Sequence, residues 1–221
     1  MICRLFVGTL VVLAACHSAA AQEYKVAKTD GAAPSGDIAP EIAALLSPTG
    51  FKVSKGERLI FEMWLAKEWP VAADAKAGGE VLYPLTPGQL IGVARYPRKG
   101  ADFRDQEIPT GTYIVRYAQQ PIDGAHVGTS PTRDFLLLLP ASKDREAKAM
   151  DYKTLTATSK ETTGTAHPAI LSMQKAEAGE PLSMREESDR GWVVVHFVGK
   201  AKQGSDVKEL PVDLVVVGKA E

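Results

Sequence analysis

Three histidines beyond residue 22 are the side chains of this sequence best suited to proton transfer or metal binding. His126 and His167 lie in segments rich in Gly, Pro and Thr, where loop residues can converge on a site. With Asp123 or Asp134 they would supply two imidazoles and one carboxylate to a metal ion. Because their spacing matches no established ligand motif, we predict no metal and no cofactor. We interpret both imidazoles as hydrogen-bond partners of loop carbonyls.

The third histidine, His196, has a different setting. It alternates with Val195 and Phe197 inside a run of branched and aromatic residues, which is typical of a β-strand. We therefore expect His196 to be a hydrogen-bonded strand residue rather than a ligand or a catalytic base.

Paired carboxylates are a second possible chemistry, because a glycosidase needs two of them at a defined separation. Glu62 lies between apolar residues of a strand-like run, and Asp134 opens a very apolar run directly after Arg133. A carboxylate among apolar residues needs a positively charged partner, and Arg133 beside Arg95 or Arg116 could provide it. We interpret both carboxylates as members of structural ion pairs.

The sequence contains none of the common catalytic motifs. It has no Gly-x-Ser-x-Gly, no His-Glu-x-x-His, no phosphate-binding Gly-Lys-Ser/Thr and no dinucleotide-binding glycine pattern. These absences favour a non-catalytic protein, although a catalytic triad is defined by geometry and its members can be scattered along the chain.

The longest interval between strand-like runs carries the residues that we predict to bind a ligand. Between Ala118 and Phe135 lie 16 residues, whereas a hairpin loop usually has about two to five. Binding groups often reside on long ordered loops above a rigid β scaffold. The alternative is that this loop merely crosses from one sheet to the other. The candidate ligand-binding residues are Asp123, His126, Ser130 and Arg133, with His167 from a second turn-rich segment.

The first 21 residues have the layout of a secretory signal. Arg4 precedes an apolar run over 5–15, which is about half the length that a membrane-spanning helix needs. Residues 13–16, Leu-Ala-Ala-Cys, resemble a lipobox, in which Cys16 would carry the lipid anchor. The alanines 19–21 fit ordinary signal-peptide cleavage equally well. The sequence thus predicts an exported protein that is periplasmic, secreted or lipid-anchored in the cell envelope.

Composition restricts which partners and which domain organisation are possible. The chain has 26 basic and 27 acidic residues without a basic run, which argues against binding nucleic acid or a membrane surface through charge. Both cysteines, Cys3 and Cys16, lie in the signal, so the rest of the chain has no disulfide. We interpret 22–38, rich in Ala, Gly, Pro and Lys, as a flexible linker, and 39–221 as a single domain.

After residue 50 the sequence consists of short strand-like runs that are separated by Gly, Pro and Asp. It predicts a mainly β protein, an antiparallel β-sandwich of jelly-roll or Ig-like type, with one or two short helices at 40–46 and 141–158. The turn Pro109-Thr110-Gly111 predicts a hairpin of 103–108 with 112–117, and a polar loop at 200–208 predicts a final hairpin. The expected strands are 51–53, 58–65, 80–83, 90–96, 103–108, 112–118, 135–139, 169–173, 192–198 and 211–217.

Three segments of the middle third, 108–113, 133–138 and 165–169, resemble uncharacterised exported bacterial proteins with a β-sandwich-like body. The resemblance implies a fold class and a compartment, and it carries over no activity.

The function that these observations favour is an exported, non-catalytic binding or envelope-associated domain. Its partner would be an envelope component or a small ligand. Two alternatives remain open: a hydrolase that acts on polysaccharide or another envelope polymer, and a periplasmic carrier of a small ligand.

Overall fold

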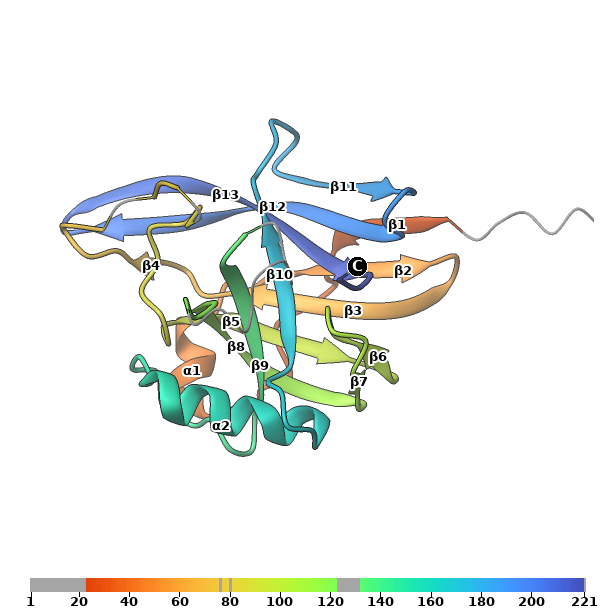
Figure 1. The fold of residues 1–221 in the computed structure, drawn as a ribbon, viewed down its shortest axis with the longest axis horizontal. Coiled ribbons are helices and arrows are strands. Elements are labelled where there is room, and N and C mark those ends of the chain that lie inside the picture. The colour runs from red at the N-terminus through yellow and green to blue at the C-terminus, as the bar shows by residue number, and fades with distance from the viewer. Residues whose placement is uncertain (1–22, 76, 80, 123–131, 221) are drawn as a thin grey trace, which may run out of the picture.

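The structure, a computed structural model, describes residues 23–75, 77–79, 81–122 and 132–220. Strands predominate and two helices accompany them, which confirms the prediction of a mainly β protein with short helices (Figure 1). The elements in chain order are β1 (Tyr24–Lys28), α1 (Pro40–Leu45), β2 (Phe51–Lys55), β3 (Arg58–Leu65), β4 (Trp69–Pro70), β5 (Leu90–Tyr96), β6 (Gly100–Ala101), β7 (Glu107–Ile108), β8 (Gly111–Gln119), β9 (Asp134–Pro140), α2 (Tyr152–Thr163), β10 (Ile170–Gln174), β11 (Leu182–Glu187), β12 (Trp192–Gln203) and β13 (Asp206–Val217).

Eleven of the strands form one curled sheet, with the order β1-β2-β3-β5-β8-β9-β10-β13-β12-β11 and with β4 beside β12. The β4–β12 pairing is parallel, so the sheet is mixed. Its two halves are continuous because β10 serves both: Leu171 pairs with Leu136 of β9, and Met173 pairs with Leu214 of β13. The end strands β1 and β11 contact each other, so the sheet curls until its edges meet. The prediction of two separate antiparallel sheets is therefore not what the strand pairing shows.

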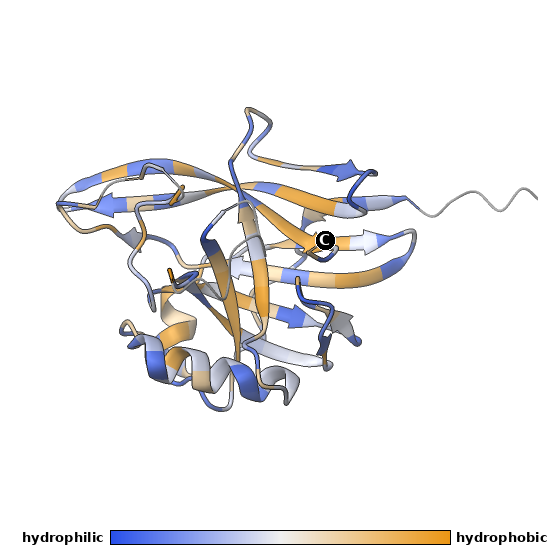
Figure 2. Ribbon diagram, viewed as in Figure 1, coloured by the Kyte–Doolittle hydropathy of each residue, from blue (hydrophilic) through white to orange (hydrophobic). Residues whose placement is uncertain are grey.

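The main core fills the inside of this curl. Figure 2 shows apolar residues along the central strands, and alternate residues of both halves point inward. Phe61 lies edge-on to Tyr96 at 5.3 Å between ring centroids, and Phe51 of the first half contacts Phe197 of the second at 5.2 Å. These contacts join the two halves, so the core belongs to one unit.

Each helix covers part of the outer face. Ile42 of α1 is fully buried against Trp64, Val93 and Ile114, whose neighbours along the strands point into the main core. Leu155 of α2 is fully buried in a second outer cluster, in which the helix packs on β9. The outer face is thus apolar where a helix covers it. Because these strands are buried on both faces, their sequences are continuous apolar runs.

Helix α2 begins later than the predicted range 141–158. The chain before it wraps around the buried guanidinium of Arg116, which accepts no hydrogen bonds and takes the carbonyls of Glu146 and Lys148 as partners. Those carbonyls cannot then serve a helix. The helix starts at Tyr152, after Asp151 as its N-cap, whose carboxylate accepts from the backbone N–H of Thr154 at 3.1 Å.

Two strand predictions are wrong. Residue 80 of this predicted strand lies outside the described residues, and 81–83 form no strand; the backbone N–H groups of Leu82 and Tyr83 donate to the side chain of Asp134 instead. The segment 103–108 does not pair with 112–117, because β8 lies between β5 and β9 while β7 pairs only with β6. A turn around Asp102 directs this segment away from β8.

Four strands were not expected: β1, β4, β6 and β11. β1 lies within 22–38, the range interpreted as a flexible linker, and pairs along its whole length with β2. β11 is short and half-buried, and β4 has two residues. The predicted final hairpin is present, but its strands continue through the polar segment 200–208 to a turn at Gly204 and Ser205. Edge strands with polar exposed residues carry a weak hydrophobic pattern, so the sequence marks them poorly.

Candidate functional site

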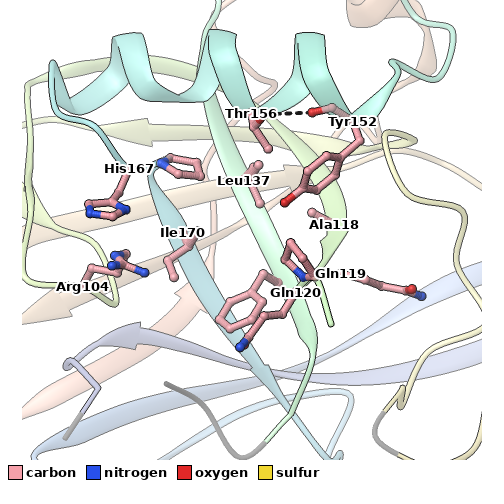
Figure 3. A pocket seen from close by; sticks show the side chains of 12 residues that line it. Arg104, Ala118, Gln119, Gln120, Leu137, Tyr152, Thr156, His167 and Ile170 are labelled. Carbon is pink, nitrogen blue, oxygen red and sulfur yellow. Dashed lines mark hydrogen bonds between the residues drawn. The ribbon is translucent and has the colours of Figure 1, made fainter. Parts of the chain in front are cut away.

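A half-open pocket of about 70 Å³ lies between α2 and the outer face of β8, β9 and β10. Figure 3 shows α2 above the pocket and the strands behind it. The floor is apolar and comes from Ala118, Phe135, Leu137 and Ile170, one or two residues from each strand. Adjacent strands bring these side chains together because residues on one face of a sheet recur at every second position.

Arg104 forms one end of the pocket, and a buried carboxylate positions it. The side chain of Asp102 accepts hydrogen bonds from the backbone N–H groups of Arg104 at 2.9 Å, Gln106 at 2.8 Å and Ile170 at 3.0 Å. Asp105 closes this turn with a φ of 63°, a conformation that Asp tolerates better than most residues. Asp102 thereby ties the turn that carries Arg104 to the strand that supplies the floor.

His167 lies at the same end of the pocket as Arg104 (Figure 3). It follows α2 in a short turn, where its backbone N–H donates to the hydroxyl of Thr165 at 3.1 Å. Gln106 links this turn to that of Arg104, because its side-chain amide donates to the carbonyl of Pro168 at 3.2 Å and to Asp102 at 2.8 Å. The two turns are therefore held as one unit.

Helix α2 supplies the opposite wall through Tyr152 and Thr156. The Thr156 hydroxyl donates to the Tyr152 carbonyl at 2.9 Å, so it is satisfied within the helix (Figure 3). The helix itself is fastened to β9, since the hydroxyls of Ser159 and Thr162 donate to the carbonyl of Leu138 at 2.9 and 2.8 Å. Both walls are thus fixed by hydrogen bonds to the same sheet.

The charge of the pocket is one-sided. Arg104 carries a permanent positive charge, and no acidic side chain is among the residues that line the pocket. Within the described residues, neither the guanidinium of Arg104 nor the imidazole of His167 has an ion pair. The pocket therefore offers an apolar floor next to the donors of Arg104. Its volume of about 70 Å³ is below the roughly 300 to 1,000 Å³ of drug-sized sites, so it would hold only part of a small anion with an apolar body.

The sequence-predicted binding residues are only partly brought together. His167 lines the pocket, whereas Asp123, His126 and Ser130 lie outside the described residues, as does Cys16. Arg133 is not among the residues that line this pocket, and its Nε and Nη2 donate to the carbonyl of Gln120 at 3.0 and 2.7 Å. Arg133 closes the base of the loop, and Gln120 and Pro121 at that base line the pocket.

The loop between β8 and β9 does not cross between sheets. β8 and β9 pair directly from Tyr113 with Pro140 to Gln119 with Asp134, so the loop connects neighbouring strands. The alternative of a sheet-to-sheet connection is therefore wrong. Sequence reasoning missed Arg104 and Tyr152, which lie far from this loop along the chain. The hydrogen bonds of Asp102 and Phe103 with Ile170 bring Arg104 close.

Other titratable groups are used for structure. His196 Nδ1 lies 2.6 Å from Asp213 Oδ1, which confirms the expectation of a hydrogen-bonded strand residue, and Arg185 pairs with the other carboxylate oxygen. Burial works to lower the pKa of Arg185, but the hydrogen bond and charge of Asp213 outweigh it and raise that pKa. Glu62 forms the predicted ion pair with Arg95, at 2.5 Å.

Asp134 has partners other than the arginine that we expected. Its carboxylate is fully buried and accepts from the hydroxyl of Tyr117 at 2.6 Å and from the backbone N–H of Leu82 at 2.8 Å. Burial raises the pKa of Asp134, and these hydrogen bonds offset part of the rise. Burial and the neighbouring carboxylate also raise the pKa of the Tyr117 hydroxyl. This network fastens the segment before β5 to the start of β9.

Among the described residues, no cluster of three or more His, Cys, Asp or Glu side chains is arranged to hold a metal ion. In the same part of the chain, no helix is long and apolar enough to cross a membrane. No known protein family, curated protein or solved structure matches this chain.

Proposed function

We propose that this chain is an exported, non-catalytic binding protein that captures a small anion with an apolar body in the pocket beneath α2. The single observation that carries the proposal is the apolar floor beside the guanidinium of Arg104, whose charge no described carboxylate neutralises, with the imidazole of His167 at the same end. An anionic group at that end would form charge-assisted hydrogen bonds with the guanidinium, which are roughly twice as strong as neutral ones.

This proposal includes the compartment and the fold description that the sequence favours. The N-terminal segment supports export to the periplasm, the exterior or a lipid anchor at Cys16. The shared core between the two halves of the curled sheet supports describing the body as sandwich-like. The partner would be a small ligand of the envelope or an anionic group on an envelope component.

The hydrolase alternative receives less support from the pocket. A glycosidase requires two carboxyl groups about 5 to 10 Å apart, and no Asp or Glu is among the pocket-lining residues that the structure describes. The small-ligand carrier is compatible with the pocket, and it differs from the leading proposal only in whether the ligand is released to a second protein.

The test is a titration of the protein with benzoate and with the neutral isostere benzamide, followed by backbone NMR shifts. Benzoate should move signals of Arg104, Gln120 and Tyr152 and bind more tightly than benzamide, because only benzoate can pair with the guanidinium. Arg104→Gln should weaken benzoate binding about tenfold, the scale of one charged hydrogen bond of about 1.5 kcal/mol.

The matched control is Arg98→Gln. The Arg98 guanidinium donates to the carbonyl of Leu59 at 3.0 Å and does not line the pocket. The proposal is wrong if benzoate and benzamide bind equally, if neither binds at millimolar concentration, or if both arginine variants weaken binding to the same extent.

A further inference from the structure

A second, larger groove lies on another part of the surface. It has a volume of about 880 Å³, within the range of about 300 to 1,000 Å³ that is typical of small-molecule sites. We call it the lysine groove. Its walls are the end of α1, the segment 66–72 that includes β4, the segment 86–90 that leads into β5, the segment 147–149 before α2, and Lys202 of β12. In Figure 1, α1 and β4 mark this side of the molecule.

Apolar side chains make up much of the lysine groove. Leu45 is 44% exposed at the end of α1, which is unusual for a large apolar residue on a covered helix. The other apolar lining residues are Ala66, Pro70, Val71, Ala72, Leu90, Ala147 and Ala149. Such a surface favours an occupant that brings an apolar chain out of water.

The charges around these side chains are mainly positive. Three lysines, Lys67, Lys148 and Lys202, line the groove together with one acid, Glu68. Lys202 pairs with Glu68 at 2.7 Å, and Lys148 pairs with Glu146 at 2.7 Å.

Lys67 stands apart from the other two lysines. Its ammonium group donates to the carbonyl of Ala44 at 2.7 Å, and it has no ion pair with any described carboxylate. A carbonyl orients an ammonium group but does not neutralise it. Lys67 therefore has two further donors for an anion.

An unsatisfied amide gives an independent sign of a ligand. Gln89 lines the groove and is 5% exposed, and its Nε2 has no hydrogen-bond partner among the described residues. The orientation of the amide is fixed, because Oε1 accepts from the backbone N–H of Thr86 at 2.8 Å and a flipped amide would oppose two donors. A buried donor without a partner is costly, and a ligand oxygen that displaced the groove side chains covering Nε2 would satisfy it.

We propose that the lysine groove binds an amphiphile with an anionic head, carboxylate or phosphate, and a single acyl chain. The head would pair with Lys67, an oxygen of the ligand would accept from Gln89, and the chain would cover Leu45, Val71 and Leu90. This site shares no lining residue with the pocket beneath α2, so the proposal stands whether or not that pocket binds an anion.

The test compares octanoate, decanoate and dodecanoate by isothermal titration calorimetry. Because the chain leaves water on binding, each added methylene should tighten binding about three- to fourfold. Lys67→Gln should weaken dodecanoate binding about tenfold. Gln89→Glu keeps the acceptor for Thr86 but replaces the donor with a negative oxygen, so it should weaken binding at least as much while circular dichroism shows a folded protein.

A control and a background separate this site from general surface charge and from the first pocket. Lys99→Gln removes a lysine that pairs with Glu107 elsewhere and should bind dodecanoate like the wild type. The titrations are repeated in Arg104→Gln protein, in which the pocket beneath α2 lacks its guanidinium, and the losses caused by Lys67→Gln and Gln89→Glu should be the same there. Flotation with phosphatidylglycerol vesicles would identify a membrane lipid as the source of the amphiphile, and binding of the free anions alone would identify a fatty acid. Absence of chain-length dependence, or equal binding by wild type, Lys67→Gln and Gln89→Glu, would overturn the proposal.

Discussion

The guanidinium of Arg116 and the carboxylate of Asp144 form a two-pronged ion pair, at 2.5 and 2.8 Å, in which neither side chain reaches solvent. The same guanidinium donates to the carbonyls of Gly88, Glu146 and Lys148. Arg116 thus fastens the segment before α2 to the outer face of β8, and both ligand-binding proposals depend on that segment.

Removing one partner of this pair should be strongly destabilising. We expect Arg116→Leu to lower the free energy of unfolding by about 3 to 5 kcal/mol, because it leaves Asp144 as an uncompensated buried charge. Urea denaturation measures this change. Adding Asp144→Leu should recover part of the loss, since the double variant has no unpaired charge. Lys143→Ala, which breaks an exposed pair with Glu161, is the control and should leave the urea midpoint unchanged.

A close approach between Gly199 and Trp69 fixes β4 on β12. A Cβ at position 199 would lie 2.0 Å from the Trp69 ring, and Trp69 itself is buried with its indole N–H donating to Ile91 at 2.9 Å. We expect Gly199→Ala to destabilise the protein by about 1 to 3 kcal/mol through overpacking. Thermal unfolding should show no such loss for Gly36→Ala, where a Cβ meets open space. Equal midpoints for both variants would contradict this packing.

The buried carboxylate of Asp134 should make stability depend on pH in an unusual direction. Its pKa is raised by burial above the ordinary 3.8, so the folded state holds this proton more tightly than the unfolded state does. The contribution of Asp134 to stability is therefore greatest below the ordinary pKa and is lost as pH rises through the raised pKa.

Comparison with Asp134→Asn isolates this contribution from those of other acids. The variant is less stable overall, because its amide opposes the N–H of Leu82. The difference in free energy of unfolding, wild type minus variant, should fall as pH rises from about 4 towards neutrality. Urea denaturation at a series of pH values measures it. A difference that is constant, or that grows with pH, would mean that the pKa of Asp134 is not raised.

The parts of the fold that the sequence predicted are those with a strong local signal. β3 and β5 have the predicted bounds because Leu59 to Leu65 and Leu90 to Tyr96 are apolar runs between turn residues. The hairpin expected at Pro109 failed because the choice of partner for β8 depends on contacts far along the chain. The buried carboxylate of Asp102 accepts from the backbone N–H of Ile170 and holds the start of the segment 103–108 beside β10. A turn motif carries no information on such distant contacts.

The candidate site was predicted less well for the same reason. His167 was chosen for its turn-rich setting and does line the pocket, but Arg104 is an ordinary surface cation until the turn around Asp102 folds. The lysine groove was not predicted, since its lysines come from segments more than 50 residues apart, from Lys67 to Lys148 and Lys202. An amide such as Gln89 becomes informative only when its lack of a partner is visible.

The fate of Cys16 is open to a direct test. If residues 13–16 act as a lipobox, the wild-type protein expressed in a bacterial host should partition into detergent, because several acyl chains make attachment durable. Cys16→Ser should then release it into the soluble fraction. Triton X-114 phase partitioning and N-terminal sequencing measure this. A soluble wild-type product beginning at Gln22 would show that cleavage follows the alanines instead.

Asp102 should link the stability of the fold to binding in the pocket beneath α2. Its fully buried carboxylate accepts from the backbone of Arg104, Gln106 and Ile170, so Asp102→Ala leaves three backbone donors without this partner, and the Gln106 side-chain amide keeps only the carbonyl of Pro168. Each such donor costs about 1 to 3 kcal/mol when it stays buried, and we expect a total loss of about 3 kcal/mol after relaxation. Because the turn is then free to move away from β10, benzoate should bind more weakly.

Asp102→Asn separates the two effects. It keeps an acceptor for part of the turn, so it should restore some stability and some benzoate affinity together, whereas Arg104→Gln should lose affinity at unchanged stability. Urea denaturation and the benzoate titration, carried out on all three variants, give both quantities. If Asp102→Ala remains folded and binds benzoate like the wild type, the turn does not position Arg104, and the guanidinium reaches the anion from a conformation that the rest of the pocket does not control.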